Sequence, residues 1–202
     1  MLFDISQFAM KTESVYMDTL SYIALGGNLP SAVGRPEVSL GAALCRLGEL
    51  GFSFVAISRF WRTPAFPSGS GPDYVNAVCK VRSDLQKDAI LATLHKVENE
   101  FGRQRDGRWA SRGLDLDLLA VGDQVCPDLE TWTHWRDLPL ERQMRDAPEE
   151  LILPHPRLHE RGFVLIPFSD IAPLWRHPVS GLTVMEMLAT LPEAEKAAIE
   201  PL

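Results

Sequence analysis

The segments of this chain of 202 residues that resemble strands and helices follow the order strand, helix, two strands, helix, strand. A buried strand is predicted at residues 21–25, and a helix should begin near Pro36, because proline suits the first turn of a helix. Two strands follow, at residues 52–61 and 74–81, separated by a loop rich in proline and glycine. A long amphipathic helix comes next, and a fourth strand covers residues 114–121. This β-α-β-β-α-β order predicts an α+β fold, a ferredoxin-like sandwich with C-terminal additions.

The same order argues against a doubly wound nucleotide-binding sheet. The turn at residues 26–28 also lacks the G-x-G-x-x-G pattern of such sheets. A further helix is predicted at residues 158–168. A last helix should open at Thr183, because Thr183 and Glu186 have the spacing of a capping box.

The two ends of the chain differ in regularity. Residues 1–20 show no clear periodicity, so we expect them to form an N-terminal extension. Residues 21–202 are expected to form one domain. A charged segment at about residues 124–150 interrupts it as an insertion, and its pattern assigns it to no particular element.

Charge and hydropathy exclude several classes of protein. The formal net charge of −7 argues against general nucleic-acid binding. No run approaches the roughly 20 apolar residues that cross a bilayer, and the N-terminus does not resemble a secretory signal. The 3 cysteines lie far apart, so neither a disulfide framework nor a zinc site is expected. We therefore expect a cytoplasmic protein without a nucleic-acid or membrane partner.

Asp115 and Asp117 form the strongest local signal for chemistry. On a strand, the two carboxylates leave one face while the leucines around them point to the core. Their Cα atoms would be about 6.5–7 Å apart, which lets the carboxylates share metal ions about 3.5–4 Å apart. Carboxylates together with phosphate oxygens are suitable ligands for magnesium. An isolated pair of this kind is also compatible with a strand whose outer face is simply solvated.

Arginines crowd the segment just before these aspartates: Arg103, Arg105, Arg108 and Arg112, with Trp109 among them. Guanidinium groups match the geometry of phosphate and stay charged. Arginines beside magnesium-binding carboxylates are expected if a polyphosphate lies between them. A solvated basic loop is the alternative for the arginines alone, but the two signals together favour phosphoryl-transfer chemistry.

Other polar residues could complete such a site. Tyr74 and Asn76 share one face of their strand, where an amide can read the edge of a heterocycle and a phenol ring can stack on it. His155, between two prolines, could contact phosphate. Taken alone, these residues are also compatible with an exposed strand face and a loop histidine. Glu98, late on the long helix, is by default a surface carboxylate.

Together these motifs resemble one family, the 6-hydroxymethyl-7,8-dihydropterin pyrophosphokinases. The similarity runs from about residue 22 to residue 191 and is interrupted at the insertion. It rests on YIALGGN at 22–28, RTP at 62–64, PDYVNA at 72–77, VENEFGRQR at 97–105, RWASRGLDLDLL at 108–119 and PHPRLHERGF at 154–163. The resemblance implies an ATP-dependent enzyme of folate biosynthesis, with residues 21–202 as its pyrophosphokinase domain.

The resemblance also implies roles for individual residues. Asp115 and Asp117 would hold two Mg²⁺ ions, with ATP as co-substrate. The catalytic set would be these aspartates with two arginines that neutralise the phosphates, Arg103 and Arg112. The pterin pocket would consist of Thr63, Pro64, Phe66, Tyr74, Asn76, Trp109 and Phe163, with the rings of Tyr74 and Phe163 as a stacking pair. The ATP contacts would be Glu98, Arg103, Arg105, Arg112, His155 and Arg161.

The implied reaction is a direct transfer, in which the pterin hydroxymethyl oxygen attacks the β-phosphorus of ATP and AMP leaves. Positioning and charge neutralisation carry most of such a reaction, and either Asp117 or bulk water could take the proton. The sequence departs from the family where Ala110 and Ser111 replace a common Gly-Pro and where Pro156 replaces an aromatic residue. The loop between Arg105 and Trp109 is also about one residue shorter than in some members of the family. These departures concern loop closure rather than the chemistry.

Two other functions fit parts of the sequence. A non-catalytic binding module for RNA or a small regulator would use the same fold, but an RNA-binding version needs a basic surface with aromatic residues on the sheet. A two-metal phosphodiesterase would use Asp115 and Asp117 but would leave Tyr74 and Asn76 unexplained. Formation of AMP from ATP that depends on added pterin separates all three functions.

Overall fold

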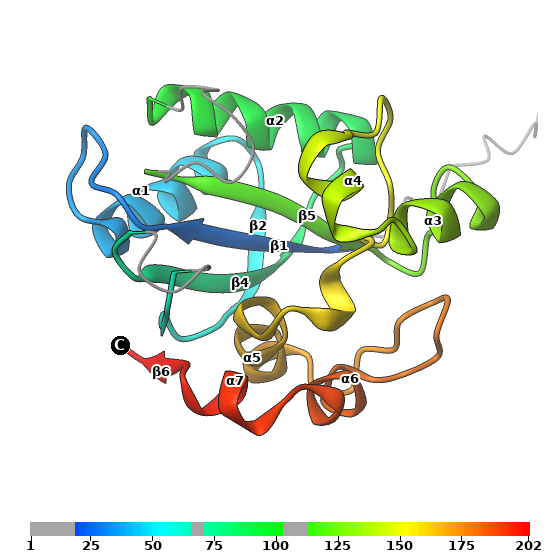
Figure 1. Ribbon diagram of the computed structural model, residues 1–202. Helices are drawn as coiled ribbons and strands as arrows, with labels where there is room; N and C mark the ends of the chain where they lie inside the picture. Colours follow the sequence, from blue (N-terminus) through cyan, green and yellow to red (C-terminus); the bar gives the residue numbers. More distant parts are fainter. Residues whose placement is uncertain (1–18, 66–70, 103–112) are drawn as a thin grey trace, which may run out of the picture.

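The computed structural model describes residues 19–65, 71–102 and 113–202 of the chain. A twisted sheet lies between two layers of helices (Figure 1). Helices α1 (Pro36–Glu49) and α2 (Lys87–Glu100) cover one face of the sheet, and the C-terminal helices cover the other.

The sheet has the strand order β5-β1-β4-β3-β6, and β2 also pairs with β4. Its strands are β1 (Leu20–Gly27), β2 (Ser53–Ile57), β3 (Trp61–Thr63), β4 (Tyr74–Arg82), β5 (Asp115–Val121) and β6 (Glu200–Pro201). Strand β1 is antiparallel to both of its neighbours, β4 and β5. This antiparallel sheet with separate helical layers confirms the predicted α+β class.

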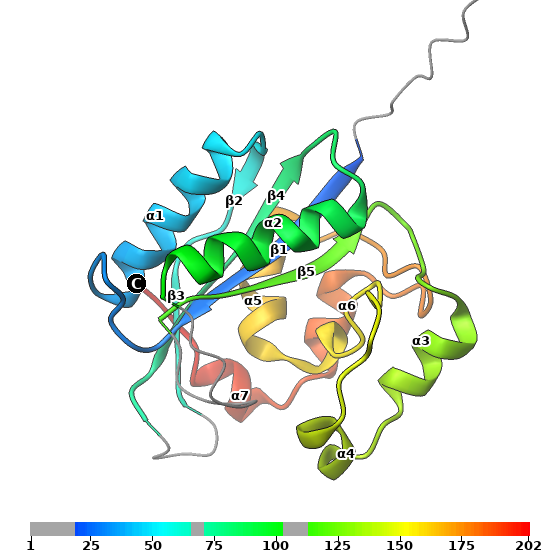
Figure 2. The ribbon, with the colours of Figure 1, turned by 90° about the horizontal axis from the view of Figure 1, so that it is seen from above.

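The C-terminal layer consists of a short 3-10 helix, η1 (Leu158–Glu160), and three α-helices: α5 (Gly162–Ile171), α6 (Val184–Thr190) and α7 (Glu193–Ala197). Helices α3 (Leu129–Arg136) and α4 (Leu140–Arg145) come from the predicted insertion and lie beyond the edge strand β5 (Figure 2). Within the described part of the chain, none of the helices combines the length and the apolar character that crossing a bilayer requires.

The face of the sheet under α1 and α2 is a continuous apolar core. The core joins alternate strand residues to the apolar stripes of both helices: Ile23, Leu25, Leu40, Leu44, Leu47, Val75, Ala77, Cys79, Ile90, Leu94 and Val97. The helical spacing seen in the sequence is therefore confirmed as the buried stripe of each helix. Gly102 follows the end of α2 with a φ of 82°, a conformation that glycine adopts without a steric penalty.

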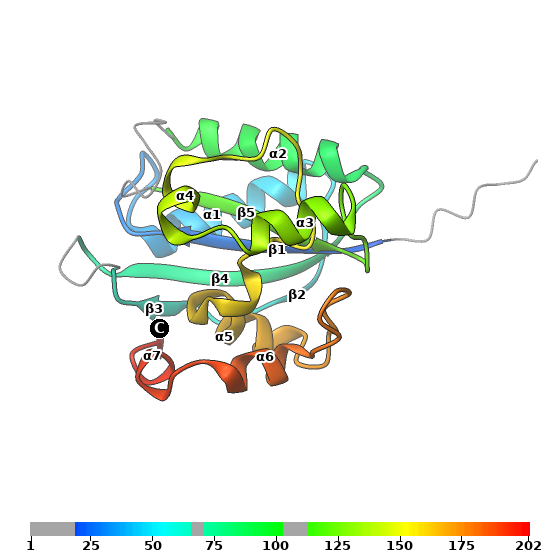
Figure 3. The same ribbon diagram turned by 45° about the vertical axis from the view of Figure 1, so that its right-hand side comes forward.

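The opposite face of the sheet is covered as well (Figure 3). Tyr22 and Val78 point to this face and pack against α5, where the ring of Phe168 lies 4.8 Å from the ring of Tyr22. The predicted alternation along β4 is thus confirmed. The alternative of an exposed strand face is wrong for Asn76, which is 6% exposed, because the C-terminal helices form a third layer over the sheet.

The predicted strand at residues 52–61 is wrong in its extent, because it is two strands. The break lies at Ser58, whose hydroxyl accepts the N–H of Val78 (3.0 Å) and donates to the carbonyl of Arg59 (2.7 Å). The N–H of Arg59 turns to the carboxylate of Asp170 (3.2 Å) instead of a strand partner. Side-chain hydrogen bonds of this kind compete with the strand ladder.

The helices after residue 150 also differ in part from the prediction. The predicted helix at 158–168 is divided at Arg161, whose φ of −113° and ψ of 110° are extended, and α5 then runs to Ile171. The capping box that opens α6 is confirmed: Thr183 Oγ1 accepts the N–H of Glu186 (3.2 Å), and Glu186 Oε2 accepts the N–H of Thr183 (2.7 Å). However, α6 is not the last helix, because α7 follows it.

Candidate active site

Polar side chains form a row across three neighbouring strands at one end of the sheet. The register pairs Gly26 of β1 with Asp115 of β5 on one side and with Asn76 of β4 on the other. Residues directly opposite each other in adjacent strands point to the same face. Because neighbouring strands lie about 4.8 Å apart, the carboxylate and the amide leave the sheet roughly 10 Å from each other.

Gly26 keeps the region between these two groups clear of side-chain atoms of its own. A Cβ atom at this position would lie 2.7 Å from Oδ1 of Asn76, so a larger residue would displace the amide. In the next row, Ala24 lies between Asp117 and Val78. Small residues of β1 therefore separate both aspartates from the residues of β4.

Asn76 is fixed at the β4 end of the row. Its Nδ2 donates to Oγ1 of Thr63 at 2.7 Å, and both residues are buried. Thr63 is paired in register with Tyr74, which is half-buried. Pro64 follows β3 and is exposed. The structure thus brings together four of the residues predicted for the pterin pocket.

Asp115 and Asp117 lie on the edge strand with partly exposed side chains. Leu116 and Leu118 alternate with them and point into the core under α2, as predicted. Glu98 is 1% exposed, and its Oε1 accepts the N–H of Leu116 at 2.8 Å. The interpretation of Glu98 as a surface carboxylate is therefore wrong. An edge strand needs acceptors for its outward N–H groups, and Glu98 supplies one between the two aspartates.

His155 lies next to the same strand, because its N–H donates to the carbonyl of Leu119 (2.8 Å). Its Nδ1 accepts the N–H of Arg157 (3.1 Å), which places the proton of the neutral ring on Nε2. Burial and the nearby Arg161 lower the pKa of His155 to about 3, although the charge of Asp115 acts in the opposite direction. At neutral pH the imidazole is therefore an uncharged N–H donor close to an aspartate.

Arg161 lies close to both aspartates, from the position just before α5. Burial lowers the pKa of its guanidinium, and the charge of Asp117 is the largest effect that raises it. Arginine stays protonated at any physiological pH. Its Cζ atom lies 5.6 Å from the centre of the Phe163 ring, and Phe163 is 39% exposed on the first turn of α5. The predicted stacking of Tyr74 with Phe163 stays a prediction.

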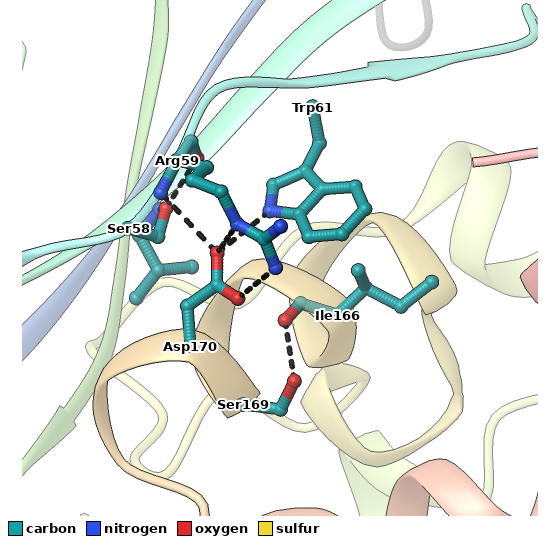
Figure 4. A network of polar contacts seen from close by, with 7 residues as sticks. Ser58, Arg59, Trp61, Ile166, Ser169 and Asp170 are labelled. Atoms are coloured by element: carbon teal, nitrogen blue, oxygen red, sulfur yellow. Dashed lines mark hydrogen bonds and ion pairs between the residues drawn. The ribbon is translucent and has the colours of Figure 1, made fainter. Parts of the chain in front are cut away.

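Asp170 of α5 anchors the strand that carries Thr63 (Figure 4). Its Oδ2 accepts from the indole N–H of Trp61 (2.9 Å) and from Nε of Arg59 (3.2 Å), and its Oδ1 accepts from Nη2 of Arg59 (2.7 Å). Trp61 is paired in register with Asn76. Asp170 therefore connects the C-terminal layer to the strand beside the candidate pterin pocket. Sequence reasoning missed this residue, because its partners lie more than 100 positions away and no local pattern marks it.

Asn28 is a second residue that sequence reasoning left without a role. It is 4% exposed, and its Nδ2 donates to the carbonyl of Pro72 (3.2 Å). This hydrogen bond joins the end of β1 to the segment that enters β4. The turn expected at residues 26–28 is wrong in its extent, because Gly26 and Gly27 belong to β1 and the chain leaves the strand only at Asn28.

Several predicted site residues lie outside the described residues: Phe66, Arg103, Arg105, Trp109 and Arg112. Their roles in the pterin pocket and around the phosphates stay predictions.

The donor set fits Mg²⁺ that is shared with a substrate. Asp115 and Asp117 offer carboxylate oxygens from one face of a strand, and the described residues contain no group of three or more His, Cys, Asp or Glu side chains that could hold a metal ion. Mg²⁺ is bound in this way by one or two carboxylates, with substrate phosphates and water as its other ligands. The two aspartates therefore suit magnesium brought with a polyphosphate better than a metal held by protein alone.

A family model for 7,8-dihydro-6-hydroxymethylpterin-pyrophosphokinase matches residues 22–173. A 2-amino-4-hydroxy-6-hydroxymethyldihydropteridine pyrophosphokinase of Haemophilus influenzae is 35% identical over 153 residues, which cover 75% of this chain and 81% of that protein. A protein of Pseudomonas aeruginosa with the same name is 34% identical over 172 residues, covering 85% of this chain and 91% of the relative.

Solved structures show a similar fold. A crystal structure of HPPK-DHPS in complex with substrates aligns with a TM-score of 0.61 over 86% of this chain and 43% of that chain, at 11% identity. A Plasmodium falciparum HPPK-DHPS triple mutant with pteroate also gives a TM-score of 0.61, over 91% of this chain and 46% of that chain, at 13% identity. This chain spans less than half of those longer chains, and at such identities the likeness shows the fold alone.

Proposed function

The chain belongs to the 7,8-dihydro-6-hydroxymethylpterin-pyrophosphokinase family, and we propose that its active site is the polar row across β5, β1 and β4. The protein is an ATP-dependent transferase of folate biosynthesis, which moves pyrophosphate from ATP to 6-hydroxymethyl-7,8-dihydropterin. One observation carries the proposal for the site: Gly26 has Asn76 on one side and Asp115 on the other, both on the same face of the sheet.

The pterin ring is proposed to bind at the β4 end of the row. Asn76 is buried and held by Thr63, so its amide is oriented before a ligand arrives. An amide offers both an acceptor and a donor to the edge of a heterocycle. Tyr74 and Phe163 are proposed to stack on the faces of the ring, with Pro64, Phe66 and Trp109 completing the pocket. The absence of a side chain at Gly26 supports a ring that continues from Asn76 toward the aspartates.

The triphosphate of ATP is proposed to bind at the β5 end, with Mg²⁺ held by Asp115 and Asp117, two ions in all. When bound, Mg²⁺ offsets the charge of the phosphates and polarises the group that is transferred. Glu98 supports this end of the row by holding the backbone N–H between the aspartates (2.8 Å). The buried carboxylate of Glu98 would then favour ATP binding indirectly, by holding β5 and its two aspartates in place.

Cationic and neutral hydrogen-bond donors are proposed to bind the phosphate oxygens from the side opposite the two aspartates and their Mg²⁺ ions. Arg161 is charged and close to Asp117, and His155 is neutral with its proton on Nε2. Arg103, Arg105 and Arg112 are proposed to complete this set. Arginine is suited to this role because its planar fork of N–H groups matches phosphate oxygens.

In the proposed reaction, the hydroxymethyl oxygen of the pterin attacks the β-phosphorus of ATP. A bond forms between that oxygen and the β-phosphorus, and the hydroxyl proton passes to Asp117 or to bulk water. The bond from the β-phosphorus to the oxygen of the α-phosphate breaks, and AMP leaves with that oxygen. The separation of roughly 10 Å between Asn76 and Asp115 across the sheet supports placing the ring and the phosphates side by side. Positioning of this kind supplies much of the rate of phosphoryl transfer.

The experiment that tests this function measures AMP released from ATP with and without the pterin alcohol. We expect AMP formation to depend on the pterin, and Asn76→Ala to weaken pterin binding while ATP affinity stays nearly unchanged. Asn99→Ala is the matched control, because Asn99 is exposed on α2. Release of AMP without pterin would favour a phosphodiesterase, and no AMP at all would favour a binding module.

Further properties of the chain are part of the same proposal. The order β1, α1, β2 with β3, β4, α2, β5 and the antiparallel pairing support a ferredoxin-like arrangement of the central sheet. We propose that residues 21–202 form one pyrophosphokinase domain, with residues 1–20 as an extension and an insertion at about 124–150. A cytoplasmic location with small-molecule partners, and with neither nucleic acid nor membrane, fits an enzyme of this class.

A further inference from the structure

A cavity lies away from the polar row and is lined by residues of α3, of the loop that leads into α6 and of α6 itself. Figure 2 shows α3 beside that loop. Its volume is about 110 Å³. The described residues that line it contain none of those proposed to bind pterin or ATP. One wall comes from α3, in the insertion that the proposed function leaves without a role.

His177 presents a buried hydrogen-bond donor in this cavity. The residue is 1% exposed, and its Nδ1 accepts the N–H groups of Val179 (3.2 Å) and Ser180 (3.3 Å). The proton of the neutral ring is therefore on Nε2. Within the described part of the chain, this buried Nε2 has no hydrogen-bond partner. A buried donor without a partner is costly, so such an atom points to a bound group that is not part of the protein.

The rest of the lining combines further donors with an apolar wall. Arg136 lies with its guanidinium 5.3 Å from the centre of the Trp132 ring, and Ser180 contributes a hydroxyl. Trp132, Leu182 and Met187 form apolar surface. None of the described residues that line the cavity is acidic, but Arg136 is paired with Asp137. His159 also lines the cavity, and its buried Nδ1 has no hydrogen-bond partner among the described residues. The site therefore offers hydrogen-bond donors at one end, among them the guanidinium of Arg136 that is paired with Asp137, and apolar contact at the other.

We propose that this cavity binds a small aliphatic monocarboxylate, with the carboxylate on Nε2–H of His177 and beside Arg136, and with the alkyl chain against Trp132, Leu182 and Met187. A dry cavity of about 150 Å³ holds a benzene molecule, so a volume of about 110 Å³ suits an acid of roughly two to four carbons.

The hydrogen bonds of His177 argue against a metal ion. A metal on Nε2 would require the proton to move to Nδ1, and Nδ1 already accepts two backbone N–H groups. Inorganic phosphate fits less well than a carboxylate, because Arg136 already gives Nε and Nη2 to Asp137 (2.7 and 2.8 Å), which leaves little net charge for a dianion.

Titration of the full-length ¹⁵N-labelled protein with sodium propionate tests this proposal, with sodium chloride used to hold the ionic strength constant. The amide signals of Val179 and Ser180 and the indole N–H signal of Trp132 report on the cavity. We expect saturable shifts with propionate and at least tenfold weaker binding of propionamide, its neutral analogue. His177→Asn keeps an acceptor near the position of Nδ1 and removes the Nε2–H, so it should weaken propionate binding at least tenfold. His134→Asn, a change at an exposed histidine of α3, should leave the affinity unchanged.

Leu182→Trp provides an independent test if His177→Asn folds poorly. Leu182 is 40% exposed, so a larger ring can be accommodated where it fills the mouth of the cavity. This variant should lose the propionate shifts and keep its pterin-dependent AMP formation. Four results would each overturn the proposal. Two concern selectivity: equal affinity for propionate and propionamide, or tighter binding of inorganic phosphate than of propionate. The other two are no saturation at about 0.1 M propionate and wild-type propionate affinity in Leu182→Trp.

Discussion

Gly26→Ala would test whether the amide of Asn76 keeps its proposed pterin-binding orientation only because Gly26 of β1 has no side chain. The added Cβ would lie 2.7 Å from Oδ1 of Asn76, closer than carbon and oxygen approach without a bond. The atom in the way belongs to a side chain, so the fold can relax by rotating Asn76. That rotation breaks its hydrogen bond of 2.7 Å to Thr63. A hydrogen bond contributes about 0.5–1.5 kcal/mol net, so the free energy of unfolding should fall by about 1 kcal/mol.

Pterin binding should suffer more than stability. A misoriented amide leaves ring donors or acceptors unpaired in a closed pocket, at about 1–3 kcal/mol, which corresponds to roughly 10- to 100-fold weaker binding. Calorimetry with the pterin and with an ATP analogue measures the two affinities separately, and ATP affinity should change less than about threefold. Gly41→Ala is the matched control, because a Cβ atom there meets nothing within 4 Å.

A double-mutant cycle sharpens this test. If Gly26→Ala acts through Asn76, it should add nothing to the loss of pterin affinity in an Asn76→Ala background. Additive losses in the cycle, or a Gly26→Ala variant with wild-type pterin affinity, would refute the reasoning.

Three further predictions concern other parts of the structure. Asp170→Asn should destabilise the protein by about 1–3 kcal/mol in urea unfolding, because the anchor of Trp61 is weakened. It should also raise the KM for pterin more than it lowers kcat. Asp170→Glu should restore part of both the stability and the KM, and an unchanged KM in Asp170→Asn would contradict the positioning role. Burial lowers the pKa of His177 to about 4, so the unfolded chain binds a proton at this residue between that value and 6.5. The contribution of His177 to the free energy of unfolding should therefore fall by about 1–2 kcal/mol from pH 7 to pH 5, in addition to that of His155. His177→Asn should lose only its own part of the slope. Arg112→Ala should lower single-turnover rates by roughly 10³-fold with little effect on ATP affinity, and a loss below tenfold would show that the residue is misassigned.

The parts of the fold that depend on local periodicity could be predicted from the sequence. Alternation placed Val75 and Cys79 on one face of β4 and Asn76 on the other, and it placed Asp115 and Asp117 together beside core leucines. These patterns depend only on the geometry of a strand, so they can be recognised without knowledge of the partners. The capping box at Thr183 was recognisable for the same reason, because both of its residues lie within one helical turn.

The remaining features depend on contacts between distant segments. Asn76 is buried because the C-terminal helices form a third layer, and no pattern within β4 predicts that layer. Glu98 is buried because the edge strand needs an acceptor, although its place on α2 is also compatible with a surface residue. The anchor at Asp170 joins residues more than 100 positions apart. Tertiary contacts of this kind outweigh local propensity, and they set much of the candidate site.

The central claim, that Asp115 and Asp117 hold magnesium against ATP, is tested most directly by an AMP-release assay of Asp117→Asn across a magnesium titration. The substitution keeps shape and polarity and removes one charge, so the fold should survive, with a melting temperature within a few degrees of wild type. We predict near-complete loss of AMP formation at all magnesium concentrations, and loss of wild-type activity on chelation. Wild-type rates from Asp117→Asn at limiting magnesium would contradict the account, because Asp117 could then not be a magnesium ligand that the reaction needs.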